Sequence, residues 1–187
     1  MYVDNLYLGE LKGYETPTRS EADDATGTCG LVAVNGGTIS LDTSVVSTNS
    51  EKSVKCTIPA GNNGVWWNFD LSLREAHHGA VNLTGKTITF DVKIVGNMSL
   101  VGFTVADGNG TYAQPDGEGY VWTNLTDGWG ADKGWVVKAL DDGWFRVSFT
   151  LDTKFSACSN NVAVLRFLLN PKDGNEASLY IDNLYLQ

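Results

Sequence analysis

Hydrophobic and polar residues alternate with a period of two along much of this chain. The alternating stretches are TITFDVKIV (87–95), SLVGFTVA (99–106), WFRVSFTL (144–151) and VAVLRFLLN (162–170). Successive side chains of a β-strand point to opposite faces, so this pattern predicts strands with one buried face. Turn-forming sequences rich in Asp, Asn and Gly separate them, and no stretch carries the start and stop signals of a helix of normal length. The sequence therefore predicts an all-β fold, an antiparallel β-sandwich.

Composition and charge narrow the class of protein further. The chain has 187 residues, 42% of them hydrophobic, which is enough for one domain with a true core. Its 22 acidic residues outnumber its 13 basic ones, and the net charge is −9. Nucleic acids and anionic membranes both select for clustered Lys and Arg, so neither is expected as a partner. No apolar run reaches membrane-spanning length and no signal peptide is present, as expected of either an intracellular protein or a piece of a longer chain.

Sequence patterns typical of catalytic and metal sites are weak in this chain. Cys29, Cys56 and Cys158 lack zinc-like spacing, and either one pair forms a disulfide or all three are free thiols. The adjacent His77 and His78 favour a surface or binding-loop role over a shared metal. No pair of carboxylates stands out as an acid and base, and no nucleophile or phosphate-binding motif occurs. The sequence therefore predicts a protein that is not an enzyme.

The chain opens and closes with almost the same seven residues. YVDNLYL (2–8) and YIDNLYL (180–186) differ at one position. Between them, four further motifs follow in the order KGYET (12–16), SEKSVKCTI (50–58), VNLTGKTITFDVKI (81–94) and DDGWFRVSFTL (141–151). In their order and spacing these motifs resemble the jelly-roll carbohydrate-binding modules that hold a glycan in a cleft, similar to families four, eleven, twenty-two and twenty-seven.

This resemblance implies a division of the chain. Residues 9–187 are expected to form one carbohydrate-binding β-sandwich module, because such modules end on an Ile-Asp-Asn strand like that of residues 180–186. Residues 1–8 are then either the residual last strand of a preceding, similar module or an extra N-terminal strand. The first alternative implies a bacterial, secreted, multimodular protein, extracellular or at the cell surface, with tandem modules and a catalytic domain in the same parent chain.

Two adjacent tryptophans in GVWWNFDLSL (64–73) must point to opposite faces of their strand. Trp67 lies on the apolar parity and is expected in the core, whereas Trp66 shares its parity with Asn68 and Asp70. An indole ring stacks on the apolar face of a sugar ring, and planar amide and carboxylate groups bond to its hydroxyls. We therefore interpret Trp66, Asn68 and Asp70 as a sugar platform. The alternative is that Trp66 covers the edge of a sheet.

A second concentration of aromatic residues lies in the Gly- and Asp-rich stretch 111–135. Large apolar surfaces are costly to leave in water, so these side chains are expected to pack on either a ligand or the sandwich. Tyr120 and Trp122 share a strand parity and can face one groove together. Four residues of this stretch are assigned to carbohydrate binding: Tyr112, Tyr120, Trp122 and Trp129.

Two arginines lie on the polar parity of their strands. Arg146 and Arg166 each carry a guanidinium fork that can donate two hydrogen bonds to a sugar diol. The favoured interpretation of Arg146 is a surface arginine paired with an acidic residue. Arg166 has Val164 and Leu168 as neighbours on its own face, a less polar setting, and it is assigned to the binding site.

The resemblance also implies a structural calcium ion that ties the first strand to the last. The positions that match its carboxylate ligands are Glu15 in GYET and Asp182 in YIDN. Carboxylate and carbonyl oxygens are the ligands that calcium prefers. The alternative is that Asp182 accepts hydrogen bonds from backbone amides of a neighbouring turn.

Two classes of function remain from the sequence. The first is a non-catalytic module that binds a plant cell-wall β-glycan, such as xylan, mannan or β-glucan, and targets an attached glycoside hydrolase; a starch-binding module is the alternative within this class. The second is a structural or adhesion sandwich that spaces other domains. The cluster of polar and aromatic residues around Trp66 favours binding, because a spacer has no use for exposed, stacking indoles.

Overall fold

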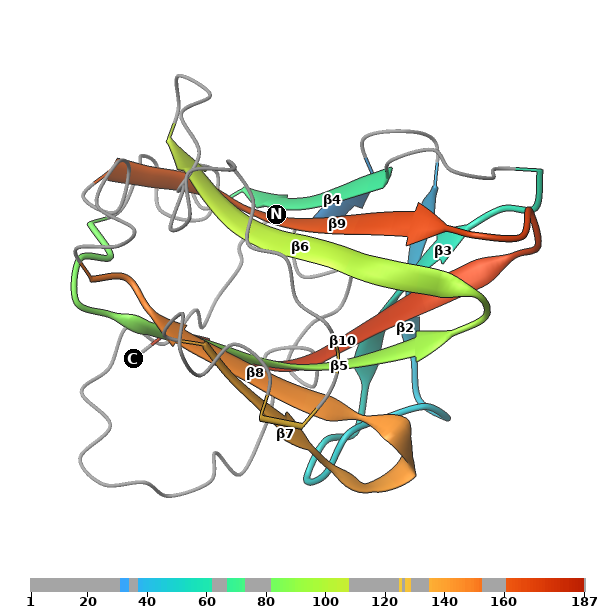
Figure 1. Ribbon diagram of the computed structural model, residues 1–187, viewed down its shortest axis with the longest axis horizontal. Helices are drawn as coiled ribbons and strands as arrows, with labels where there is room; N and C mark the ends of the chain where they lie inside the picture. Colours follow the sequence, from blue (N-terminus) through green and yellow to red (C-terminus); the bar gives the residue numbers. More distant parts are fainter. Residues whose placement is uncertain are drawn as a thin grey trace.

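Two antiparallel β-sheets stacked face to face form the described part of the chain (Figure 1). The computed structural model describes residues 31–33, 37–61, 67–72, 82–107, 125, 127–128, 135–152 and 161–186. One sheet has four strands in the order β1-β4-β9-β6, and the other has six in the order β2-β3-β10-β5-β8-β7. The fold class predicted from the sequence, an all-β antiparallel sandwich of jelly-roll type, is confirmed.

The four stretches that alternate in the sequence all form strands, two in each sheet. The four-stranded sheet contains β1 (Leu31–Ala33), β4 (Trp67–Ser72), β6 (Met98–Asp107) and β9 (Val162–Pro171). The six-stranded sheet contains β2 (Thr38–Asp42), β3 (Ser53–Ile58), β5 (Thr87–Val95), β7 (Trp135–Ala139), β8 (Phe145–Thr150) and β10 (Ala177–Leu186). The described residues also form a short 3-10 turn, η2 (Asp141–Gly143). Among them there is no helix that is long and apolar enough to cross a membrane.

Four phenylalanine rings join the two sheets at the centre of the core. Phe90 and Phe149 come from the six-stranded sheet, and Phe103 and Phe167 come from the four-stranded sheet. The ring centroids of contacting pairs lie 4.9 to 5.2 Å apart in tilted or edge-on arrangements. Such geometry suits the ring quadrupoles and adds to the apolar area that these side chains bury.

The alternation along β9 predicts its core side correctly. Leu165, Phe167 and Leu169 are fully buried, as expected for one face of a half-buried strand. The opposite face is more covered than alternation alone predicts, because Leu168 is only 4% exposed. In β6 the strict alternation predicted for residues 99–106 is interrupted, since the pairing with β9 shifts between Leu100 and Gly102.

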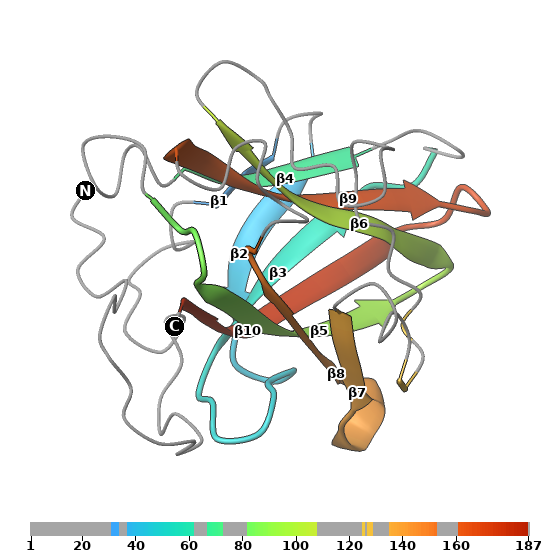
Figure 2. The same cartoon turned by 60° about the vertical axis from the view of Figure 1, so that its left-hand side comes forward.

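The connection from β2 to β3, residues 43–52, lies on the side of the six-stranded sheet that faces away from the four-stranded sheet (Figure 2). Its first turn is held by Asp42, whose Oδ1 accepts hydrogen bonds from the Ser44 and Val45 amides at 2.8 and 3.0 Å. Burial tends to raise the pKa of Asp42, and the hydrogen bonds from Ser44 and Val45 lower it on balance. The Ser53 hydroxyl donates to the Val45 carbonyl at 2.6 Å. This connection is therefore an ordered cover of one sheet.

Candidate functional site

The four-stranded sheet brings three of the predicted site residues into register. Asp70 of β4 is the cross-strand partner of Arg166 of β9, and Asn68 is the partner of Leu168. Arg166 is also the partner of Thr104 in β6. Residues that are far apart in sequence thus form one row, Asp70–Arg166–Thr104, across three strands. A row of this kind is the unit through which a sheet presents side chains to a neighbour or a ligand.

Arg166 and Thr104 lie on the face of the sheet that is turned away from the core. Phe69 and Phe167, which alternate with the row in β4 and β9, are both fully buried in the core. Arg166 is half-buried, whereas its partner Thr104 is 1% exposed. The outward face is therefore covered toward β6 and more open at Arg166.

Six of the predicted site residues lie outside the described residues, and their assignments stay predictions. They are Glu15, Trp66, Tyr112, Tyr120, Trp122 and Trp129. The described part of the predicted carbohydrate site consists of the strand positions of Asn68 and Asp70 together with Arg166.

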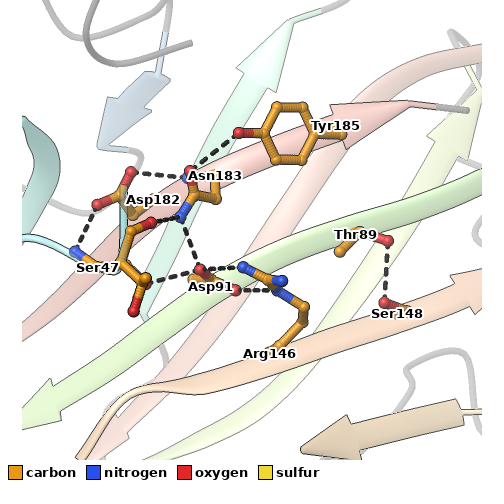
Figure 3. A network of polar contacts seen from close by, with 9 residues as sticks. Ser47, Thr89, Asp91, Arg146, Ser148, Asp182, Asn183 and Tyr185 are labelled. Carbon is orange, nitrogen blue, oxygen red and sulfur yellow. Dashed lines mark hydrogen bonds and ion pairs between the residues drawn. The ribbon is translucent and has the colours of Figure 1, made fainter. Parts of the chain in front are cut away.

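A second polar region lies on the outer face of the six-stranded sheet (Figure 3). Its centre is an ion pair between β8 and β5, in which Arg146 Nε donates to Asp91 Oδ1 at 2.7 Å and Nη2 donates to Oδ2 at 2.8 Å. These hydrogen bonds to Asp91 raise the pKa of Arg146, against the opposite effect of burial. Arg146 is thus paired with an acidic residue, as its favoured interpretation predicts, but the Asp91 side chain is fully buried.

Further donors complete the surroundings of Asp91. The Ser47 hydroxyl donates to Asp91 Oδ2 at 2.7 Å, and the Asn183 side-chain amide donates to the same oxygen at 2.8 Å. Asn183 also donates to the Thr48 carbonyl at 3.2 Å and accepts from the Tyr185 hydroxyl at 2.9 Å. The network therefore fastens the 43–52 connection to β5 and β10, and it satisfies a carboxylate that would otherwise be costly to bury.

Asp182, one of the two predicted calcium ligands, belongs to this network (Figure 3). Its Oδ2 accepts a hydrogen bond from the Ser47 amide at 2.8 Å, and its Oδ1 accepts from the Ser50 hydroxyl at 2.8 Å and from the Asn183 amide at 2.7 Å. These contacts match the alternative role for Asp182, that of an acceptor for a neighbouring turn. Any calcium ion would have to share the carboxylate with these donors, and its other predicted ligand, Glu15, lies outside the described residues.

Sequence reasoning did not single out Asp91, Ser47 or Asn183. The visible signal was the Asp-Asn pair that recurs at both ends of the chain, because two polar residues in an otherwise apolar strand need a local reason. The polar parity of Asp91 in residues 87–95 was also visible. Nothing in the sequence indicates that residues 43–52 fold over this parity and bury it.

The described residues offer little for thiol chemistry or metal binding. Cys56 is a free thiol, fully buried in the core, and burial raises its pKa. The question of a disulfide is thereby narrowed to Cys29 and Cys158, which lie outside the described residues. Within the described ranges, no group of three or more His, Cys, Asp or Glu side chains could hold a metal ion.

Fold and topology define the chain as a β-sandwich of the kind found in carbohydrate-binding modules, and the predicted resemblance is confirmed at this level. The chain is similar to the xylan-binding domain of family 22 from Paenibacillus barcinonensis, with 19% identity, a TM-score of 0.52 and 89% of each chain covered. A structure of carbohydrate-binding modules of the β-sandwich superfamily, described as promiscuous in specificity, matches at 14% identity and a TM-score of 0.56, covering 86% of this chain and 58% of that one.

A carbohydrate-binding module of family 30 matches at 17% identity and a TM-score of 0.50, over 84% of this chain and 77% of that one. Similarity at this level of identity establishes the fold and leaves the ligand open. Neither a family model nor a curated protein matches the chain.

Proposed function

We propose that this chain is a non-catalytic carbohydrate-binding module that binds a plant cell-wall β-glycan in a cleft and targets an attached glycoside hydrolase to it. Xylan is the first candidate ligand, because the family 22 domain of similar fold is described as xylan-binding. Mannan and β-glucan are the other candidates. The proposal includes a secreted, multimodular parent chain with tandem modules and a catalytic domain.

The row Asp70–Arg166–Thr104 is the observation that carries this proposal. It places an acidic and a basic residue at partner positions on neighbouring strands. An arginine fork donates hydrogen bonds and a carboxylate accepts them, so together they match the mixed donors and acceptors of adjacent sugar hydroxyls. A neutral polymer requires this polar complementarity because it offers no charge of its own.

The predicted aromatic platform supplies the second half of the binding chemistry. Trp66 immediately precedes β4, the strand that carries Asn68 and Asp70. An indole beside this row would stack on the apolar face of a sugar ring while the polar side chains hold its edge. The aromatic residues of 111–135 are the further candidates for such stacking, and their role stays a prediction.

Affinity electrophoresis against soluble xylan, mannan, mixed-linkage β-glucan and starch tests the proposal. We expect at least one β-glycan to retard the protein, and we expect Arg166→Gln to reduce that retardation. Lys138→Gln is the matched control, since Lys138 is an exposed residue on β7 of the other sheet and should leave retardation unchanged. Retardation by starch alone would favour the starch-binding alternative, and no retardation by any glycan would favour the spacer.

The absence of catalysis is tested on the same glycans. We expect no reducing sugar to be released above a heat-treated control, because no acid and base pair stands out in the sequence. Release of sugar from any glycan of the panel would contradict the non-catalytic part of the proposal and leave the binding part standing.

Calcium binding through Glu15 and Asp182 stays a separate proposal. If an ion is bound, EDTA lowers the melting temperature, because a ligand that binds only the folded state stabilises it. Asp182→Ala should then remove the sensitivity to EDTA. A melting temperature that EDTA leaves unchanged, with no ion copurifying, would contradict the assignment and leave Asp182 as a hydrogen-bond acceptor alone.

A further inference from the structure

The last strand of the six-stranded sheet has a second copy of its sequence at the other end of the chain. β10 lies between β3 and β5 and pairs with both along most of its length. Residues 2–8 are identical to residues 180–186 of β10 at six of seven positions, with Val3 in place of Ile181. The contacts of β10 show what these seven residues do in the sheet.

The apolar positions of the motif fill the core, and its first tyrosine covers the sheet. Ile181 and Leu184 belong to the central hydrophobic cluster and are 2% and 8% exposed. The Tyr180 ring is buried on the outer face, with Lys55 Nζ 5.7 Å from its centroid. In the copy, Val3 is smaller than Ile181 by one methylene group and is also apolar.

The polar positions of the motif have roles that ordinary strand residues do not share. Asp182 accepts hydrogen bonds from the Ser47 amide and the Ser50 hydroxyl, and Asn183 donates to Asp91. Asn183 also has a φ of 46°, in the left-handed region, at a point where the pairing with β5 shifts register. Asn is among the few residues that tolerate this conformation. The pair Asp-Asn thus anchors β10 to the 43–52 connection and to β5.

The copy has the same residue types in the same order. Asp4 and Asn5 repeat the polar pair, both tyrosines and both leucines recur, and Val3 stands in place of Ile181. Residues 9–30 separate the copy from β1 and can extend over roughly 70 Å, so the copy can reach any part of the sheet.

We propose that residues 2–8 are a second strand of the β10 type, able to occupy the position between β3 and β5 when residues 180–186 leave it. Exchange of equivalent strands between identical positions is the basis of domain swapping, and it gives a module a way to join its neighbour. This proposal is independent of glycan binding, because it involves only the six-stranded sheet.

Disulfide trapping tests the exchange directly. Lys55 is the cross-strand partner of Tyr180, so Lys55 becomes the partner of Tyr2 if the copy takes the place of β10. Opposite residues of antiparallel strands have Cα atoms about 4.5 to 5.5 Å apart, which suits a disulfide. The probe is a full-length chain that carries Tyr2→Cys and Lys55→Cys, with its three native cysteines replaced by Ala. Tyr180→Cys with Lys55→Cys is the positive control.

The exchange is promoted by weakening β10 with Asp182→Ala and Asn183→Ala. We expect the Tyr2→Cys disulfide to be close to background in the chain with intact β10 and to rise at least tenfold in the weakened chain. A monomeric product would mean exchange within one chain and a dimeric product exchange between two copies, and both support the proposal. Absence of the disulfide in the weakened chain would overturn it, whether that chain stays folded or unfolds.

Melting temperatures test the same strand exchange in a second way. Asp4→Ala with Asn5→Ala should leave the melting temperature of the intact chain unchanged, because β10 then occupies its own position. In the weakened chain the same two substitutions should lower it by several degrees, since the substituting strand loses its own polar anchor. Equal melting temperatures with and without the Asp4→Ala and Asn5→Ala substitutions in the weakened chain would overturn the proposal.

Discussion

Each sheet places an aspartate opposite an arginine on neighbouring strands, and the 43–52 connection covers the pair of the six-stranded sheet. Asp70 pairs in register with Arg166 on the four-stranded sheet, and Asp91 pairs with Arg146 on the six-stranded sheet. Along the sequence they look alike, since each residue lies on the polar parity of its strand. The second pair is overlaid by residues 43–52, whose Ser47 binds Asp91.

The comparison shows that the role of an Asp–Arg pair depends on whether other residues of the chain bury it. Once the 43–52 connection excludes water, Asp91 and Arg146 depend on each other, and removing one leaves the other desolvated without a counter-charge. Asp70 and Arg166 are cross-strand partners in the other sheet, and the 43–52 connection lies on the side of the molecule that faces away from that sheet (Figure 2). We therefore assign the six-stranded pair to the fold and propose the four-stranded pair for binding.

The largest effect is expected from Asp91→Ala. This change leaves the half-buried Arg146 without its carboxylate, and it removes the acceptor of Ser47 and Asn183. Loss of one partner from a buried ion pair costs about 3 to 5 kcal/mol. Urea unfolding measures the loss, with Lys138→Ala as an exposed control. If Asp91→Ala lowers the free energy of unfolding by less than about 1 kcal/mol, as expected of an exposed ion pair, the assignment of this pair to the fold is wrong.

Trp66 and Trp67 test the same distinction, between residues that stabilise the fold and residues that bind glycan, on a single strand. Trp67 shares its parity with the fully buried Phe69, so Trp67→Ala should destabilise the protein by about 3 to 5 kcal/mol. Trp66→Ala should leave stability almost unchanged and weaken glycan binding by about 2 kcal/mol or more, as expected of a binding hot spot. Melting temperature and retardation by glycan are measured on both variants. If Trp66→Ala is the unstable one, the binding face has been assigned to the wrong side of β4.

An intermediate effect is expected from the two arginines. Arg166→Gln should weaken glycan binding by about 1.5 to 3 kcal/mol, the range of a hydrogen bond to a charged group, with a much smaller effect on unfolding. Arg146→Gln should do the reverse, because its guanidinium holds the buried Asp91. Titration of the retarding glycan and urea unfolding are compared for both variants. Equal losses of binding would mean that the ligand does not distinguish the two sheets.

The fold was largely predictable from the sequence because alternation reports the core directly. The stretch 87–95 coincides with β5, and in β9 the predicted apolar face of Leu165, Phe167 and Leu169 is the buried one. The binding face was predictable only as a parity, since Asp70 and Arg166 are almost one hundred residues apart and meet through strand order alone.

The polar network was not predictable, for two physical reasons. Burial of Asp91 depends on a connection that folds back across the sheet, a tertiary contact between residues 44 positions apart. The left-handed conformation of Asn183 and the register shift beside it break the two-residue period on which the sequence analysis depends. Alternation of apolar and polar residues predicts only regular strands, and this network lies where β10 is irregular.

The smallest effect is expected one row beyond the Asp91–Arg146 pair, where it marks how far the covered region extends. The hydroxyls of Thr89 and Ser148 are 2.9 Å apart and half-buried (Figure 3), and those of Thr87 and Thr150 are 2.9 Å apart and exposed. Cross-strand hydroxyl pairs contribute roughly 0.2 to 1 kcal/mol. Thr89→Val should fall in the upper part of this range and Thr87→Val near its lower end, as measured by urea unfolding. A loss for Thr89→Val comparable to that of Asp91→Ala would mean that the cover reaches beyond the ion pair, and the two outer faces would then differ over the whole sheet.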